Sequence, residues 1–262
     1  MTYETILFEK RDAVGRITLN RPDDANALNL TMATELHSAA LDCDRDPAVR
    51  AVLLSAVGKM FSGGGDLKSF NAEKGPLSRH LMRTAGEFHR AVSIFNRMAA
   101  PLVIAVNGVA AGGGFSLAIM GDLVIAADSA RFTLAYTAAG LSPDGSSTFF
   151  LPRFIGARRA KELMLTNRML SAAEALDYAI VDRVVPDADL AGEAEKQALA
   201  FAQGPTSAYG AVKRLVNASF NESLETQMEL ESRSISRLSD GHDAPEGIAA
   251  FTEKRKPDFK GH

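Results

Sequence analysis

Cysteine is almost absent from this 262-residue chain, since Cys43 is the single copy. One thiol excludes an intramolecular disulfide framework and suits a reducing cytosol. A surplus of positive charge is missing as well, because 29 Lys and Arg residues face 32 Asp and Glu residues, for a net charge of -3. We therefore expect neither a nucleic-acid partner nor an anionic membrane surface. The opening segment MTYETILFEK lacks the basic-then-apolar pattern of an export signal, so a cytoplasmic location is expected.

Metal-ligand spacing is also missing among the histidines, so we expect no metal site and place them on solvent-facing helix surfaces: His37, His80, His89, His242 and His262. One uncharged run, residues 102–121, has the length of a membrane span. Its glycines, Asn107 and Ser116 lower its hydropathy, and no basic flank frames it. Because 46% of all residues are apolar, we assign the run to a sizeable globular core and expect no membrane partner.

The stretch 101–127, PLVIAVNGVAAGGGFSLAIMGDLVIAA, organises the chain. A β-rich run at 102–106 precedes three glycines at 112–114, and a helix-compatible apolar run separates these from a second β-rich run at 122–127. This order predicts strand, glycine turn, buried helix and strand. The three glycines leave bare backbone against which a ligand can lie. The first N–H groups of a helix that starts there suit an oxygen with negative charge.

A second glycine turn lies in FSGGGDLK, residues 61–68. It also follows a predicted strand, at 49–55, and precedes a polar helical stretch. Two such turns in one chain suggest two backbone N–H donors that converge on one oxygen, as in an oxyanion hole. Backbone donors need no side chain, which explains the use of glycine at both places.

Apolar spacing and turn residues divide the chain into two predicted regions. Strands are expected at 3–9, 14–20, 49–55, 102–106, 122–127 and 181–185, with a short extended piece at 131–134. Helices are expected at 30–41, 87–98, 160–165, 172–178, 190–202, 206–218 and 223–239, with loop plus helix start at 71–86, a loop at 141–147 and helix from 148 onward. Alternating strands and helices favour a parallel sheet. Gly204-Pro205 separates this α/β body (1–203) from a helical tail (204–262), which we expect to pack on the body or on another subunit.

Four motifs in order along the chain resemble those of the crotonase (enoyl-CoA hydratase/isomerase) superfamily. They are LNRP with NAL (19–22 and 26–28), FSGGGDLK (61–68), NGVAAGGG (107–114) and EGIAAFTEKR (246–255). The resemblance implies an α/β fold with a spiral core of ββα turns and a helical C-terminal oligomerisation domain, in homotrimers that often pair into hexamers. It also implies an acyl-CoA substrate, with coenzyme A as part of the substrate and no separate cofactor.

The resemblance also implies roles for particular residues. The thioester oxygen is expected between the backbone N–H groups of Gly65 and Gly113. Coenzyme A is expected along two segments, the first with Asp24, Ala25 and Ala27, the second with Gly63, Asp66, Leu67 and Lys68. Phe251 and Lys254 match a tail segment that contacts the coenzyme A of a neighbouring subunit in many members, and a solvated face is the alternative for Lys254.

The acid/base residue decides the reaction. Family hydratases use two glutamates, and this chain has Ser116 and Tyr136 at the matching positions. Neither side chain has an acidity suited to proton transfer near neutral pH, which argues against ordinary hydratase activity. Asp144, in GLSPDG, lies where some family isomerases keep their catalytic acid, the epoxyphenylacetyl-CoA and Δ3,Δ2-enoyl-CoA isomerases being most similar. Asp144 is therefore predicted to shuttle a proton from C2 to C4, while Tyr136 hydrogen-bonds the substrate or simply packs.

Several alternatives remain at this point. Asp144 also suits a plain Pro-Asp-Gly turn. Residues 114–118, GFSLA, resemble a loose nucleophile elbow, which would make the chain a serine hydrolase with Ser116 as nucleophile. The others are a non-catalytic coenzyme A-binding protein, a hydratase acting through Asp144 alone, and a thioesterase or dehalogenase-like hydrolase of the same fold.

Overall fold

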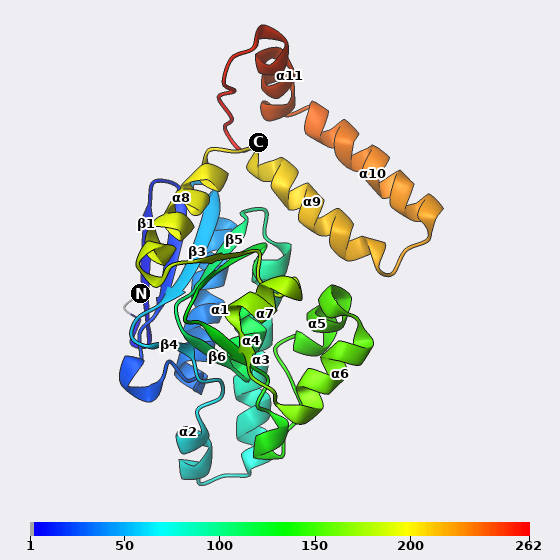
Figure 1. Ribbon diagram of the computed structural model, residues 1–262. Coiled ribbons are helices and arrows are strands. Elements are labelled where there is room, and N and C mark those ends of the chain that lie inside the picture. The colour runs from blue at the N-terminus through cyan, green and yellow to red at the C-terminus, as the bar shows by residue number, and fades with distance from the viewer. Residues whose placement is uncertain (1–2) are drawn as a thin grey trace.

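The structure, a computed structural model, describes residues 3–262 and contains two β-sheets with helices around them (Figure 1). The larger sheet has the order β1-β2-β3-β5-β7-β10 and the smaller one has the order β4-β6-β8-β9. The strands are β1 (Ile6–Arg11), β2 (Val14–Leu19), β3 (Ala51–Ala56), β4 (Met60–Ser62), β5 (Leu102–Val106), β6 (Val109–Ala111), β7 (Leu123–Ala127), β8 (Arg131–Thr133), β9 (Leu170–Ser171) and β10 (Arg183–Val185). Strands β1 and β2 form an antiparallel hairpin, and β2, β3, β5, β7 and β10 run parallel.

Helices follow the strands in a repeating order. They are α1 (Leu30–Arg45), α2 (Leu67–Ala72), α3 (Leu77–Arg97), α4 (Gly113–Ala118), α5 (Ser147–Ile155), α6 (Ala157–Thr166), α7 (Ala172–Asp177), α8 (Leu190–Ala202), α9 (Thr206–Ser219), α10 (Leu224–Ser239) and α11 (Asp243–Glu253). A long strand, a short strand and a helical segment recur as β3-β4-α2/α3, β5-β6-α4 and β7-β8-α5. Because β3, β5 and β7 pair in parallel in the larger sheet, and β4, β6 and β8 do so in the smaller one, the chain winds as the spiral of ββα turns that the motifs imply.

Most predicted elements are confirmed, with three differences. Strands β4, β6 and β9 were not predicted as separate strands, since two or three residues are too few to show an alternating pattern. Helix α3 begins at Leu77, inside the segment 71–86 predicted as loop plus helix start, and continues without a break into the helix predicted at 87–98. Pro76 fits a helix start, and Leu77, Leu81 and Phe88 share the helical spacing. Helix α11 contains much of the EGIAAFTEKR motif. This segment was interpreted only as a family motif and was not predicted as a separate helix of the tail.

The tail helices extend from one end of the body. Figure 1 shows α9 beside the body, with α10 and α11 farther out. Helix α8 packs against the larger sheet, next to β3, β5 and β7, and α9 starts just after the Gly204-Pro205 break. The division at 203/204 as a domain boundary stays a prediction. Among residues 3–262, no helix combines the length and apolar character that a membrane crossing requires.

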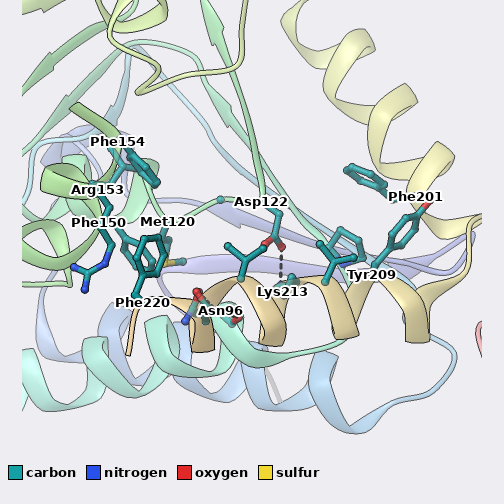
Figure 2. A pocket seen from close by; sticks show the side chains of 16 residues that line it. Asn96, Met120, Asp122, Phe150, Arg153, Phe154, Phe201, Tyr209, Lys213 and Phe220 are labelled. Carbon is teal, nitrogen blue, oxygen red and sulfur yellow. Dashed lines mark hydrogen bonds and ion pairs between the residues drawn. The ribbon is translucent and has the colours of Figure 1, made fainter. Parts of the chain in front are cut away.

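An ion pair with a buried lysine attaches the tail to the body. The Lys213 ammonium on α9 lies 2.6 Å from Asp122, just before β7, and its side chain is only 9% exposed. The same ammonium donates to the carbonyl oxygens of Phe95, at the end of α3, and Ala100. Figure 2 shows this pair within a cavity of about 370 Å³ between α9 and the body, with Phe201 and Tyr209 on one side and Phe150 and Phe154 on the other. Helix α9 is therefore held by charge as well as by apolar contact.

Candidate active site

One cavity of about 410 Å³ is lined by the predicted oxyanion-hole glycines and the predicted acid/base residue. Gly65, Gly113, Tyr136 and Asp144 all line it. Its apolar walls come from the loop before α1, from α2 and α3, and from the loop before α5: Leu28, Phe70, Leu81, Met82, Phe88 and Leu141. Mostly apolar walls with a few convergent polar groups are typical of a small-molecule site.

The Gly65 amide faces away from the chain segment that pairs with its turn. Leu28 and Gly65 form an isolated parallel bridge, in which the Leu28 amide donates to Gly64 O at 2.7 Å and the Asp66 amide donates to Leu28 O at 3.0 Å. These bonds use the residues on either side of Gly65, so its own N–H points to the opposite side. No acceptor for this N–H occurs among residues 3–262, and Gly65 lines the cavity.

The Gly113 amide belongs to the first residue of α4, so no intrahelical acceptor exists for it. The preceding amide, that of Gly112, donates to Thr133 O at 3.0 Å, while Gly113 N–H has no acceptor within residues 3–262. The two glycine turns touch, because a Cβ added to Gly64 would lie 3.2 Å from Gly113 N and 2.7 Å from Ala111 O. Two free amides from touching turns therefore border one cavity.

Hydroxyl groups surround Asp144. The Tyr136 hydroxyl donates to Asp144 Oδ1 at 2.6 Å, and the Ser116 hydroxyl donates to Asp144 O at 2.8 Å. Ser147 Oγ donates to the same carbonyl at 3.0 Å. Ser116 Oγ and Tyr136 Oη lie 3.0 Å apart, so the two positions that the motif resemblance matches to hydratase glutamates meet beside Asp144.

His89 is a further member of the site. Its Nε2 lies 3.6 Å from Asp144 Oδ2 and accepts a hydrogen bond from the Gly145 amide at 3.1 Å. The ring is 51% exposed, so the predicted position on a helix surface is correct. No local motif marks His89. The nearest signal is its place directly after Phe88 on the cavity side of α3.

Burial and charge act on both partners of Asp144. Burial, and then the nearby Asp144 carboxylate, raise the pKa of Tyr136 far above its usual value, so the phenol stays protonated and can donate. The Asp144 carboxylate, which can accept from the protonated ring and attracts its charge, raises the pKa of His89 above 6.5, against the opposing effect of burial. The site therefore pairs one carboxylate with a permanent hydroxyl donor and a titratable imidazole.

Ser116 does not have the surroundings of a serine nucleophile. Its side chain is fully buried on α4 and contacts the Gly112 and Asp144 carbonyl groups and the Tyr136 hydroxyl. None of the hydrogen bonds recorded for the described part of the chain joins Ser116 to a histidine. A hydroxyl nucleophile needs an adjacent general base, so the nucleophile-elbow alternative lacks its second residue.

The two segments predicted to hold coenzyme A lie side by side. The Arg21 guanidinium bridges Asp24, at 2.9 Å, and Asp66, at 3.0 Å, and also donates to Ala27 O. The Gly63 amide donates to Ala25 O at 2.8 Å. Gly63 and Leu67 also line the cavity, where Leu67 is exposed. Lys68 extends outward, and its ammonium lies 3.5 Å from Asp24. Their contact with coenzyme A stays a prediction.

Phe251 and Lys254 are not part of this cavity within one chain. Both lie at the end of α11, away from α2, α3 and α4 (Figure 1), and Phe251 is 85% exposed. Their predicted contact is with a neighbouring subunit, so their distance from the cavity of their own chain leaves that prediction open. Across residues 3–262, no cluster of three or more His, Cys, Asp or Glu side chains is arranged to hold a metal ion.

Comparison with known proteins identifies the class that this fold and cavity define. Residues 9–262 match the family described as "Enoyl-CoA hydratase/isomerase". A solved structure of enoyl-CoA hydratase from Bacillus anthracis superposes with a TM-score of 0.92 at 32% identity, covering 99% of this chain and 100% of the other. The fold is therefore that of the crotonase superfamily, as the motifs imply.

Sequence relatives place the chain within that class. The 1,2-epoxyphenylacetyl-CoA isomerase of Escherichia coli (strain K12) is 38% identical over 260 residues, 98% of this chain and 99% of that protein. The 4-chlorobenzoyl coenzyme A dehalogenase-2 of Arthrobacter sp is 34% identical over 233 residues, 88% of this chain and 84% of that protein. The chain belongs to the enoyl-CoA hydratase/isomerase family.

Proposed function

We propose that this chain is an enoyl-CoA isomerase that moves a double bond along the acyl group of a coenzyme A thioester. The observation that carries the proposal is a single carboxylate, Asp144, in the same cavity as the free amides of Gly65 and Gly113. The amides would stabilise an enolate oxygen, and the carboxylate would move the proton.

The reaction needs only these groups. Asp144 takes the proton from C2 of a 3-enoyl thioester, and the electron pair of that C–H bond forms an enolate whose oxygen accepts from the two amides. The proton then returns from Asp144 to C4, so the double bond moves from C3–C4 to C2–C3. Atoms and charge balance without a second acid, and removing one such amide donor typically costs roughly 3–4 kcal/mol of transition-state stabilisation.

Two-glutamate hydration fits the site poorly. Ser116 and Tyr136 occupy the glutamate positions and lie 3.0 Å apart. The raised pKa of Tyr136 prevents the phenol from acting as a base near neutral pH. The Escherichia coli relative is named as an isomerase, which supports the same choice.

Reaction in deuterated water tests the proposal. The purified protein is incubated with 3-enoyl-CoA and, separately, 2-enoyl-CoA, and the products are analysed by mass spectrometry and NMR. Interconversion of the two substrates, with deuterium at C2 or C4 and no added water, is the expected result. Asp144→Asn should lower kcat by roughly 100- to 10,000-fold while coenzyme A affinity changes little. Clean formation of 3-hydroxyacyl-CoA by the wild type would contradict the proposal.

A second candidate is a hydrolase that uses Asp144 as a nucleophile, and the imidazole of His89 next to that carboxylate favours it. An aspartate can form a covalent ester with a substrate carbon as that carbon loses its leaving group, and an imidazole can then deprotonate the water that cleaves the ester. The Arthrobacter relative is named as a dehalogenase, which agrees with this chemistry. A single turnover of 4-chlorobenzoyl-CoA in ¹⁸O water would place ¹⁸O in the peptide containing Asp144. An unlabelled peptide and intact substrate would exclude this candidate.

The remaining assignments complete the proposal. Coenzyme A would lie along the joined segments 24–27 and 63–68 as part of the substrate, without a separate cofactor. Phe251 and Lys254 would reach the coenzyme A of a neighbouring subunit in a homotrimer or a dimer of trimers, in the cytoplasm. Sedimentation of the wild type, and the KM for acyl-CoA of Phe251→Ala at fixed protein concentration, test this arrangement. A monomer with an unchanged KM would contradict it.

A further inference from the structure

The hydroxyl groups of Tyr136 and Ser116 both donate their protons to acceptors on Asp144. Tyr136 Oη approaches Asp144 Oδ1 to 2.6 Å, its shortest contact, and the ionised carboxylate can only accept. The proton of Ser116 has a good acceptor in the Asp144 carbonyl at 2.8 Å, and Ser147 supplies a second donor to that carbonyl at 3.0 Å. Each hydroxyl has one proton to give, so neither Tyr136 nor Ser116 keeps one for the substrate.

The surroundings hold the tyrosine in this state. Tyr136 is half-buried against the apolar core, and its raised pKa keeps the phenol protonated over the working pH range. A charge-assisted bond of this kind is roughly twice as strong as one between neutral groups. The other carboxylate oxygen, Oδ2, has a different neighbour, since His89 Nε2 lies 3.6 Å away. The two oxygens of Asp144 therefore have different partners.

We propose that Tyr136, supported by Ser116, is the positioning residue of this site: it fixes Asp144 through Oδ1 and leaves Oδ2 as the oxygen that exchanges the substrate proton. The inference rests on the proposed isomerase activity and replaces the predicted contact of Tyr136 with the substrate. It also explains the two departures from the hydratase pattern. At the positions matched to the hydratase glutamates, Ser116 and Tyr136 do not activate water. They hold Asp144, which lies on the loop before α5, through its backbone carbonyl group and its carboxylate.

Tyr136→Phe tests the inference, because it removes one hydroxyl and keeps the ring. The measured quantities are kcat, KM, and the fraction of deuterium that passes from C2 of a labelled 3-enoyl-CoA to C4 of the product. A loosened carboxylate should lower kcat by about 10- to 100-fold, since small misplacement of a catalytic group has effects of this size. KM should stay within about twofold, and label transfer should fall as protons exchange with water.

The transferred fraction is the decisive readout, because general damage to the fold lowers the amount of active enzyme without changing how each turnover distributes its proton. Tyr178→Phe is the matched control, since it removes a phenol outside the cavity that meets Arg168 at 3.4 Å. The control should keep the wild-type label transfer. Ser116→Ala removes one donor to the Asp144 carbonyl, so it should lower label transfer in the same direction but by less.

A crystal structure of Tyr136→Phe separates this inference from the proposed function. The expected result is an Asp144 carboxylate turned away from its wild-type orientation. A carboxylate that stays in place, with kcat and label transfer within about twofold of wild type, would overturn the positioning role. If the wild type fails to isomerise 3-enoyl-CoA, the proposed function is wrong, and the orientation of the carboxylate still decides whether Tyr136 holds it.

Discussion

Gly64→Ala should uncouple the two glycine turns without touching any side chain that performs chemistry. Gly64 has a φ of +90°, and an added Cβ would lie 2.7 Å from Ala111 O and 3.2 Å from Gly113 N. All real Cβ atoms avoid the shorter of these distances, so the turn that carries Gly65 must move away from the turn that carries Gly113. The methyl group would therefore separate the two free amides.

The structure sets the size of both effects. A left-handed alanine costs roughly 1–2 kcal/mol, and an overpacked methyl roughly 1–3 kcal/mol, so the free energy of unfolding should fall by about 2–5 kcal/mol. A displaced oxyanion donor lowers kcat by roughly 100- to 1,000-fold. Isomerisation of 3-enoyl-CoA at saturating substrate measures kcat, and urea unfolding followed by circular dichroism measures stability and the folded fraction.

Gly156→Ala is the matched control. Gly156 also has a positive φ, +78°, but nothing lies within 4 Å of an added Cβ. It should lose stability through backbone strain while kcat per folded molecule stays at the wild-type value. If Gly64→Ala is destabilised but keeps kcat within about threefold of wild type, contact between the turns is irrelevant to catalysis and the paired-amide explanation is refuted.

Three other outcomes follow from contacts described above. Lys213→Met leaves the Asp122 carboxylate, whose side chain is 27% exposed, without its cation and should cost about 1–3 kcal/mol in urea unfolding, with part of the loss recovered by adding Asp122→Asn; a loss below about 0.5 kcal/mol would contradict the role of the pair. NMR titration should give His89 a pKa above 6.5 that returns to its usual range in Asp144→Asn; because the folded-state value is raised, the stability from this pair is complete below about pH 6.5 and is lost as pH rises through the raised pKa. Gly145→Ala, with a φ of +59° and a Cβ that would clash with the Phe88 ring, should displace Asp144 and lower kcat by roughly 100-fold, and wild-type kcat in a folded variant would contradict this.

The parts of the molecule that local chemistry specifies were predictable from the sequence. Glycine at 63–65 and 112–114 marks backbone that approaches other backbone, and the structure shows Gly64 against the Ala111 carbonyl. The apolar run 102–106 was predicted as a strand, and it forms β5, which is buried along its whole length within the parallel sheet. The motif order then identified the spiral, which periodicity alone had left as an unspecified α/β body.

Contacts between distant segments were not predictable in this way. His89 and Asp144 are 55 positions apart and meet because α3 passes beside the loop before α5. Tyr136 was predicted to hydrogen-bond the substrate or simply to pack, and in the structure its hydroxyl donates to Asp144 Oδ1. The acceptor of a hydroxyl hydrogen bond depends on which oxygen the fold brings nearest, so it cannot be predicted from the pattern of residues along the chain.

Helix α3 contacts both the tail and the cavity, and this affects how family members can be recombined. At about 1.5 Å per residue, its 21 residues span about 30 Å, with Leu81 and Phe88 in the cavity wall and the Phe95 carbonyl under the Lys213 ammonium. A chimaera with the helices after Pro205 from another family member would change the contacts that α9 makes with the C-terminal end of α3. Acyl-group selectivity in such hybrids would then follow the origin of the tail as well as the origin of the body.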